Sequence, residues 1–142
     1  MQQNRNTKQK KIILSIAQSR CDHPTADRIY LEARAIDNKI SRGTVYRNLE
    51  QLSEMGALLR VKVPGADRFD SRADNHYHMI CRKCGNVFDA PIEYCREIDR
   101  QVCEISGFTV EYHNTVFEGI CRSCKQADEE NKGNNTGIVS CK

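Results

Sequence analysis

The 142-residue sequence contains no tryptophan and only 6% aromatic residues. It also lacks a long apolar run, since the run at residues 12–17 is far short of the roughly 18 residues that a membrane span needs. No small-residue cleavage site follows that run, so it makes a poor signal peptide. The chain has no phosphate-binding loop, nucleotide fingerprint or nucleophile–base pair. These absences argue against a membrane protein, a secreted protein and an enzyme.

Cysteine, by contrast, is abundant, with eight residues. We expect a cytoplasmic protein, where thiols stay reduced, so the cysteines indicate metal or redox chemistry rather than a disulfide framework. The chain is long enough for one domain or two small ones. Halves of about 70 residues are marginally stable alone and usually need a metal or a partner subunit.

The net charge of +3 is unevenly distributed. Residues 1–72 hold 14 Lys and Arg against 8 Asp and Glu, whereas residues 73–142 hold 8 against 11. A basic N-terminal half suggests that this half meets a polyanion such as nucleic acid. Many solvated protein surfaces have a similar balance, so charge alone leaves both interpretations open.

Three helical patterns follow one another in the basic half. Residues 7–19 carry apolar side chains on one face. Thr25 is placed to cap a second helix, and Ser41 is placed to cap a third, which ends before Gly56. Residues 58–70 then alternate in polarity, with a Pro-Gly turn in the middle, which indicates a β-hairpin. Three helices and a hairpin predict a winged helix-turn-helix.

The third helix would be the recognition helix, whose N-terminal residues face the bases in the major groove. Arginine can form a bidentate pair of hydrogen bonds with guanine, while threonine and tyrosine can hydrogen-bond to bases or phosphates. The hairpin adds a lysine near the phosphate backbone. The predicted DNA-contacting residues are Arg42, Thr44, Tyr46, Arg47 and Lys62. The alternative is an ordinary amphipathic helix with a solvated basic face.

The C-terminal half predicts a small α/β unit. A helix over about residues 92–106 would bury a stripe formed by Cys95, Ile98, Val102 and Ile105. Residues 108–113 and 115–121 are expected to be strands, and the polar segment after Lys125 is expected to be disordered. The whole chain is therefore predicted to be α+β. A winged-helix domain (1–72) is followed by a small α/β domain (73–125) that contains most of the candidate metal ligands described below, and by a disordered tail (126–142).

Two histidines and two cysteines crowd into the segment NHYHMICRKCG at residues 75–85. Cys81 and Cys84 form one C-x₂-C pair, and Cys121 and Cys124 form a second pair 36 residues further on. Two such pairs make a tetrahedral thiolate site that suits zinc. The alternatives are two unrelated thiol pairs or one redox-active pair.

His76 and His78 would point to one face of a strand, away from the cysteines. His23, Asp70 and Asp89 are further candidate ligands, but spacing alone does not bring these five residues together. Imidazole and carboxylate ligands would suit Fe²⁺ or Mn²⁺ rather than zinc.

Five segments carry a resemblance to a known family: HPTADRIY (23–30), SRGTVYRNL (41–49), RFD (68–70), HYHMICRKCG (76–85) and GICRSC (119–124). Over residues 7–125 the chain resembles the ferric uptake regulator (Fur) family. The resemblance implies a dimeric, metal-responsive, DNA-binding protein with a structural Cys₄ zinc, in which the α/β unit at residues 73–125 would be the dimerisation and metal-binding domain. It also implies a regulatory Fe²⁺ or Mn²⁺ site formed by His23, Asp70, His76, His78 and Asp89.

Within that family the chain looks closer to the peroxide-sensing PerR branch, because it has Asp89 where iron-sensing members usually have glutamate. Tyr77 replaces an aspartate of an additional site found in iron-sensing members, so His113 is expected to be structural or on the surface. By resemblance, peroxide would oxidise a ligand histidine, His23 or His76, and relieve repression. The alternative is an iron-uptake repressor.

The chain also departs from the family pattern. It begins close to its first winged-helix helix, so we expect an extra N-terminal helix to be absent or reduced. Its contribution to DNA binding would then be missing, or be replaced by a basic tail with Arg5, Lys8 and Lys10. Cys141 stands alone, without a partner pair. Two rival classes are a thiol oxidoreductase using Cys81 and an RNA-binding zinc ribbon, which the scarcity of aromatic residues disfavours.

Overall fold

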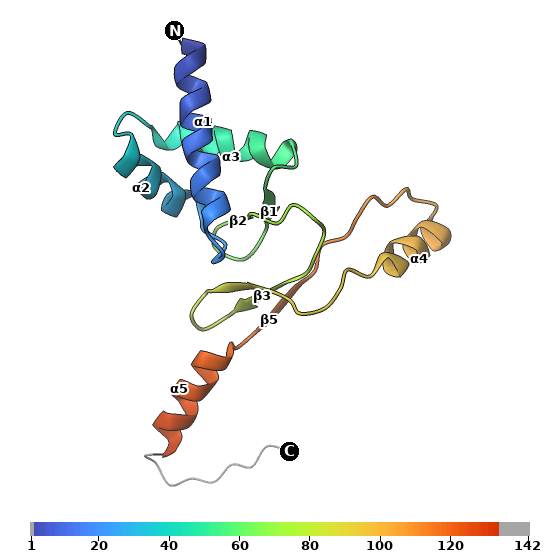
Figure 1. Ribbon diagram of the computed structural model, residues 1–142. Coiled ribbons are helices and arrows are strands. Elements are labelled where there is room, and N and C mark those ends of the chain that lie inside the picture. Colours follow the sequence, from blue (N-terminus) through green and yellow to red (C-terminus); the bar gives the residue numbers. More distant parts are fainter. Residues whose placement is uncertain (1, 134–142) are drawn as a thin grey trace. The chain divides into compact units, whose positions relative to one another are not determined.

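A computed structural model (Figure 1) describes residues 2–133 and shows an α+β chain, as predicted. One compact unit ends at His76 and a second begins at Tyr77. The helices are α1 (Gln2–Ser19), α2 (Ala26–Ile36), α3 (Arg42–Glu54), α4 (Arg96–Ser106) and α5 (Arg122–Gly133); the strands are β1 (Leu59–Val61), β2 (Arg68–Asp70), β3 (His78–Cys81), β4 (Val87–Asp89) and β5 (Val116–Gly119).

Helices α1, α2 and α3 pack against one another in the first unit (Figure 1). Both predicted caps are present: the Thr25 hydroxyl accepts from Arg28 N at 3.2 Å, and the Ser41 hydroxyl accepts from Thr44 N at 3.1 Å. Each satisfies a backbone donor that a helix start leaves free. The largest fully buried side chains of this unit are Ile13, Ile29, Val45, Leu49 and Leu58.

The predicted hairpin follows α3. Strands β1 and β2 pair antiparallel, with Leu59 opposite Asp70, and the turn between them contains Gly65 at φ 95°. Glycine adopts this left-handed conformation without strain. The predicted winged helix-turn-helix is confirmed. Arg5, Lys8 and Lys10, expected in a tail, lie instead on α1.

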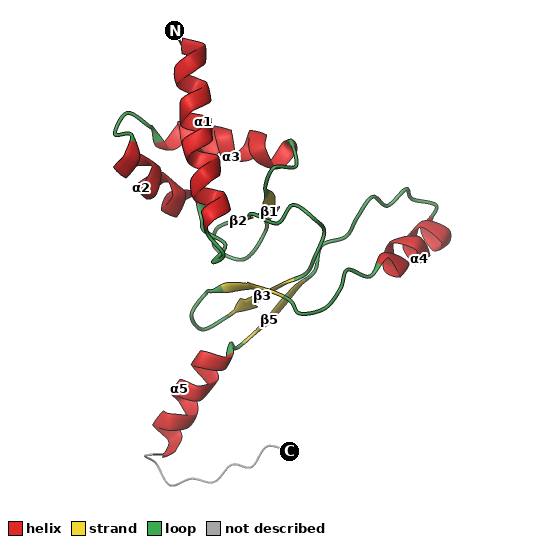
Figure 2. Cartoon of the chain, in the orientation of Figure 1, coloured by secondary structure: helices red, strands yellow, loops and turns green. Residues whose placement is uncertain are grey.

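The second unit contains a three-stranded sheet in the order β4-β3-β5. Strand β4 is antiparallel to β3, whereas β5 is parallel to it. A parallel neighbour requires a long crossover, and α4 with its flanking loops supplies it (Figure 2). The parallel pairing brings the end of β5 beside the end of β3, with Cys81 opposite Gly119.

Helix α4 corrects one prediction. The residues expected to form a buried stripe are exposed, by 46% at Ile98, 43% at Val102 and 87% at Ile105, and Cys95 is the exposed N-cap. Figure 2 shows α4 standing apart from the sheet of its own unit. The amphipathic pattern was interpreted correctly as a helix, but nothing within the described chain covers its apolar face.

The segment 108–113, predicted to be a strand, has no strand structure. Its backbone donors bond to side chains instead of to another strand. Val110 N donates to Cys103 Sγ at 3.2 Å, and His113 N donates to the Tyr94 hydroxyl at 2.8 Å. These bonds satisfy the backbone locally, so the alternation in polarity does not produce a ladder.

The polar segment after Lys125, predicted to be disordered, continues as α5 up to Gly133. Asp128 on α5 forms an ion pair with Lys83, next to the first cysteine pair. The rest of the predicted tail, including Cys141, lies outside the described residues. Within residues 2–133, no helix is both long and apolar enough to cross a membrane.

Candidate metal sites

The two C-x₂-C pairs are brought together by the parallel strands β3 and β5. Cys81 ends β3, and a tight turn leads to Cys84, closed by a 2.8 Å bond from Gly85 N to Cys81 O. Cys121 follows β5, and Cys124 lies in the first turn of α5. The chain therefore presents the two pairs from adjacent strand ends, although they are far apart in sequence.

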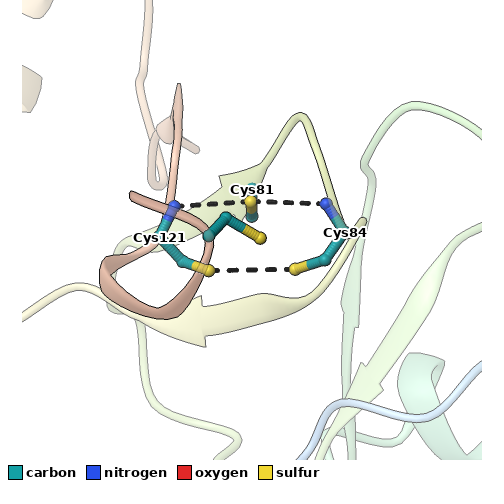
Figure 3. Close-up of side chains that lie close together, drawn as sticks. Cys81, Cys84 and Cys121 are labelled. Atoms are coloured by element: carbon teal, nitrogen blue, oxygen red, sulfur yellow. Dashed lines mark hydrogen bonds between the residues drawn. The ribbon is translucent and has the colours of Figure 1, made fainter. Parts of the chain in front are cut away.

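The four sulfur atoms all lie within 4.8 Å of one another. The Sγ atoms of Cys84 and Cys121 are 3.9 Å apart (Figure 3). Tetrahedral zinc with Zn–S bonds of about 2.3 Å places its sulfurs roughly 3.8 Å apart. The chain thus contains a Cys₄ site of the size and ligand chemistry that zinc requires.

Hydrogen bonds and neighbouring sulfurs make the four thiols unequal. Cys81 Sγ accepts from the backbone N–H groups of Cys121 at 3.3 Å and Cys84 at 3.4 Å (Figure 3). The hydrogen bond from Cys121 has the largest effect and that from Cys84 the next largest, and together they lower the pKa of Cys81 to about 6. The hydrogen bond to Cys121, together with burial, raises the pKa of Cys124 to about 12. Cys81 therefore ionises easily, whereas four thiolates this close together repel one another unless a cation lies among them.

Three of the five predicted ligands of the regulatory site meet in the first unit. Asp70 Oδ2 lies 3.1 Å from His23 Nε2 and 2.8 Å from His76 Nε2. The loop carrying His23 is joined to β2 by the bond from Phe69 N to Pro24 O at 3.0 Å. His23 has φ 52°, a left-handed conformation that is uncommon for a residue other than glycine and that clusters at functional sites.

The His76 ring is oriented by a second contact. Its Nδ1 lies 2.7 Å from the carbonyl oxygen of Asp74, which can only accept, so Nδ1 carries the proton. Nε2 is then the ring nitrogen that faces Asp70, on the side where a metal ion could bind. This arrangement of backbone carbonyl, imidazole and ligand position is the usual support of a metal-binding histidine.

The second unit contributes His78 and Asp89. They lie directly opposite each other on the antiparallel strands β3 and β4, so their side chains share a face of the sheet. His78 Nε2 is 3.6 Å from Asp89 Oδ1. Together the two units carry three imidazoles and two carboxylates, a ligand set that suits Fe²⁺ or Mn²⁺.

His113, expected to be structural or on the surface, is held in a hydrogen-bond network inside the second unit. Its Nε2 lies 2.8 Å from the Tyr77 hydroxyl, and its Nδ1 lies 2.6 Å from Asp99. The ring also stacks on Tyr94, which donates to Asp99 at 2.5 Å. The hydrogen bonds from Tyr94 and then His113 keep the pKa of Asp99 below its usual value. Sequence reasoning missed Tyr94 and Asp99, since nothing in their spacing signals this contact.

The predicted DNA-contacting side chains lie on α3 and just after β1. Arg47 and Lys62 are exposed, and Tyr46 is 49% exposed. Thr44 is only partly exposed, and its hydroxyl bonds to the Ser41 cap at 2.8 Å. Arg42 is exposed and pairs with Asp27 on α2. Sequence reasoning did not single out Asp27.

Residues 1–118 match the sequence model of the ferric uptake regulator family. This match covers most of the chain, including the winged helix and the first cysteine pair. The chain belongs to the ferric uptake regulator family. The family is one of transcriptional regulators and not a class of enzymes.

Among curated relatives, the peroxide-responsive repressor PerR of Staphylococcus aureus is 34% identical over 122 residues, which cover 85% of this chain and 82% of the relative. PerR of Staphylococcus epidermidis is 32% identical over 123 residues, covering 86% and 82%. Among solved structures, the peroxide stress regulator of Campylobacter jejuni superposes with a TM-score of 0.70 at 26% identity, covering 87% of this chain and 93% of that one. The likeness to the PerR branch noted in the sequence is thus found among the curated relatives, whereas the solved structures that resemble the chain include both peroxide regulators and ferric uptake regulators.

Proposed function

We propose that the chain is a cytoplasmic, metal-dependent transcriptional repressor that binds double-stranded DNA as a homodimer and senses peroxide. One observation carries the proposal: metal-ligand side chains stand on both sides of the boundary between the two units, which falls between His76 and Tyr77. Metal binding at this boundary would act on the orientation of the DNA-binding unit.

The regulatory site takes His23, Asp70 and His76 from the first unit and His78 and Asp89 from the second. His76 and His78 are two residues apart, so their Cα atoms stay within about 7 Å whatever the orientation of the units. An ion that takes ligands from both sets selects one orientation of the winged helix. In a dimer, that orientation decides whether two recognition helices match half-sites one turn of DNA apart.

The zinc site has a structural role in this proposal. Its four protein ligands are Cys81, Cys84, Cys121 and Cys124, which leave no open position for a substrate. The thiolates occupied by zinc are also unavailable for the disulfide exchange that a thiol oxidoreductase would need.

The DNA-binding surface is formed by α3 and the wing. Arg42, Tyr46 and Arg47 supply donors for base edges and phosphates, Thr44 lies in the first turn of α3, and Lys62 lies where a wing approaches the backbone. The excess of positive charge in residues 1–72 favours the same polyanionic partner.

The exposed apolar face of α4 is the proposed dimer contact. Ile98, Val102 and Ile105 follow the helical repeat, and Phe108, 73% exposed, lies just beyond the helix end. A contiguous apolar face of this kind marks an interaction site, and the chain's family assembles as dimers.

The variant Val102→Glu tests this contact. A buried, unpaired carboxylate at the interface should raise the dimer dissociation constant at least about 100-fold, measured by sedimentation equilibrium. Gln101→Glu adds the same charge at the neighbouring exposed position, outside the stripe, and should leave the dimer intact. Dimerisation that survives Val102→Glu would place the interface elsewhere.

The peroxide response is proposed to reside in the ligand histidines. Fe²⁺, when bound, supplies the electrons that convert peroxide into an oxidant beside the imidazoles, whereas Mn²⁺ does not. His23 and His76 both contact Asp70, so oxidation of either ring disturbs the same cluster of the first unit. Loss of a ligand would weaken metal binding and release DNA.

Mass spectrometry of the protein loaded anaerobically with Fe²⁺ and then treated with a low concentration of peroxide tests this proposal. We expect peptides containing His23 or His76 to gain one oxygen atom, and the Mn²⁺-loaded protein to gain none. The variant Asp89→Glu introduces the glutamate that iron-sensing members usually have at this position. It should keep metal-dependent DNA binding and lose the peroxide response. Unmodified histidines, with DNA binding still dependent on Fe²⁺, would instead support the iron-uptake repressor.

A further inference from the structure

Asp27, in the first turn of α2, contacts two of the side chains that are proposed to bind DNA. Its Oδ1 accepts a hydrogen bond from the Tyr46 hydroxyl at 3.0 Å and also pairs with Arg42 Nη1. Arg42 and Tyr46 are four residues apart, so they share a face of α3. The hydrogen bond to Asp27, with some burial, raises the pKa of Tyr46, so its hydroxyl stays a donor.

Arg42 is held from a second side by α2. Its guanidinium carbon lies 4.9 Å from the centre of the Tyr30 ring, within cation–π range. The guanidinium is thus held by a carboxylate and an aromatic ring, both of α2. Before Arg42 can bind a guanine or a phosphate with both arms, it has to give up its contact with Asp27.

The Asp27 carboxylate also lies on the surface that DNA would approach. Together with Tyr46 and Arg47 it lines a hollow of about 610 Å³, whose other side is formed by wing residues that include Arg60 and Asp67. Arg60 and Asp67 already pair with each other at 2.6 Å. Asp27 is 57% exposed, so its charge faces this hollow and is not buried beneath it.

The position of Asp27 at the start of α2 also opposes the binding of a DNA phosphate. Backbone N–H groups at a helix start attract anions, and DNA phosphates commonly dock there. Asp27 places a carboxylate of the chain itself in the first turn of α2, where the helix dipole favours it. A phosphate arriving at this point therefore meets a like charge.

We propose that Asp27 determines specificity: its carboxylate competes with DNA phosphates for Arg42 and Tyr46, and so suppresses binding to DNA that offers phosphates alone. Arg42 and Tyr46 lose their contacts with Asp27 when they bind DNA. In an operator, new contacts from these two side chains to the bases compensate for that loss, whereas random DNA offers no such contacts. Penalising the wrong partner is a general route to selectivity. The proposal rests on the DNA-binding function proposed above.

The test compares Asp27→Asn with Asp37→Asn in the full-length, metal-loaded protein. Asp37 caps the other end of α2, about 15 Å away, so both variants lose one negative charge from the same helix. Binding is measured by fluorescence anisotropy on a duplex selected by the wild-type protein from a random pool, and on a scrambled duplex. Asp27→Ala is included because asparagine can still accept from Tyr46.

We expect both Asp27 variants to bind the scrambled duplex about fivefold more tightly, the effect of one unit charge about 4 Å from a phosphate in water. Binding to the selected duplex should tighten less, so the ratio of the two dissociation constants falls. If Asp27→Asn and Asp37→Asn changed the dissociation constants by the same factors, the effect would come from net charge alone, and the proposal would be overturned. Weaker binding to both duplexes would overturn it too, because Asp27 would then only position the recognition helix. A wild-type protein that selects no sequence would contradict the repressor function as well.

Discussion

Replacing Cys121 by serine is expected to abolish zinc binding and to unfold the second unit. Structural zinc of this kind contributes on the order of 10 kcal/mol to folding. The second unit has little else to replace it, because the main cluster of buried apolar residues runs from Ile13 to Phe69 and lies wholly in the first unit. Cys81 and Cys121 stand at the ends of the neighbouring strands β3 and β5, so losing the metal also releases the sheet.

Two measurements check this expectation: the zinc content of the purified protein, and thermal unfolding followed by circular dichroism. The first unit should keep its own unfolding transition, since its core contains no cysteine ligand. Cys103→Ser is the matched control, because Cys103 lies in the same unit but outside the Cys₄ set, and a serine oxygen can accept the bond from Val110 N. A Cys121→Ser protein that keeps zinc and unfolds normally would contradict a structural role for the site.

The winged helix could be predicted from the sequence because its signals are local. Thr25 and Ser41 cap their helices with their own hydroxyls, and the turn at Gly65 needs only a residue that tolerates positive φ. The Cys₄ site was predictable for a related reason. Each C-x₂-C pair is a short-range pattern, and soft thiolates select zinc whatever path the chain takes between the pairs.

Where prediction from sequence was wrong, the competing contacts are non-local. The apolar stripe of α4 is a genuine helical pattern, but the described residues leave Val102 43% exposed, because the pattern alone does not provide a surface to pack against. Residues 108–113 alternate like a strand, yet Tyr94 and Cys103 take up their backbone donors. Helix α5 is polar enough to suggest disorder, but it carries Cys124 in its first turn and its Asp128 pairs with Lys83, and both features favour order.

The His/Asp ligand set falls between these cases. Only His76 and His78 form a short-range pattern, and spacing alone could not join them to His23 or Asp70. The resemblance to the Fur family was what joined these candidates into one site. The structure then shows why the three ligands of the first unit, His23, Asp70 and His76, belong together. Strand β2 ends at Asp70, and the backbone bond from Phe69 N to Pro24 O holds the loop that carries His23 beside it.

Asp70→Asn should therefore have the second large effect, on the regulatory metal. One oxygen of Asp70 lies against both His23 and His76, so this carboxylate supplies the charge of the first unit's ligand set. Asparagine keeps the shape and an oxygen acceptor but removes the charge that draws a divalent cation. We expect the dissociation constant for Mn²⁺, measured by calorimetry on zinc-replete protein, to rise at least about 100-fold, since even supporting residues around a metal site matter 10- to 100-fold.

The control for this variant is Asp67→Asn, which removes one carboxylate from the same wing but lies in an exposed pair with Arg60. It should bind Mn²⁺ like the wild-type protein. Both variants should retain zinc, because the Cys₄ set belongs to the second unit. Metal-dependent DNA binding should be lost in Asp70→Asn. Native Mn²⁺ affinity in Asp70→Asn would mean that the ion is held elsewhere, and the coupling between the two units would then need another origin.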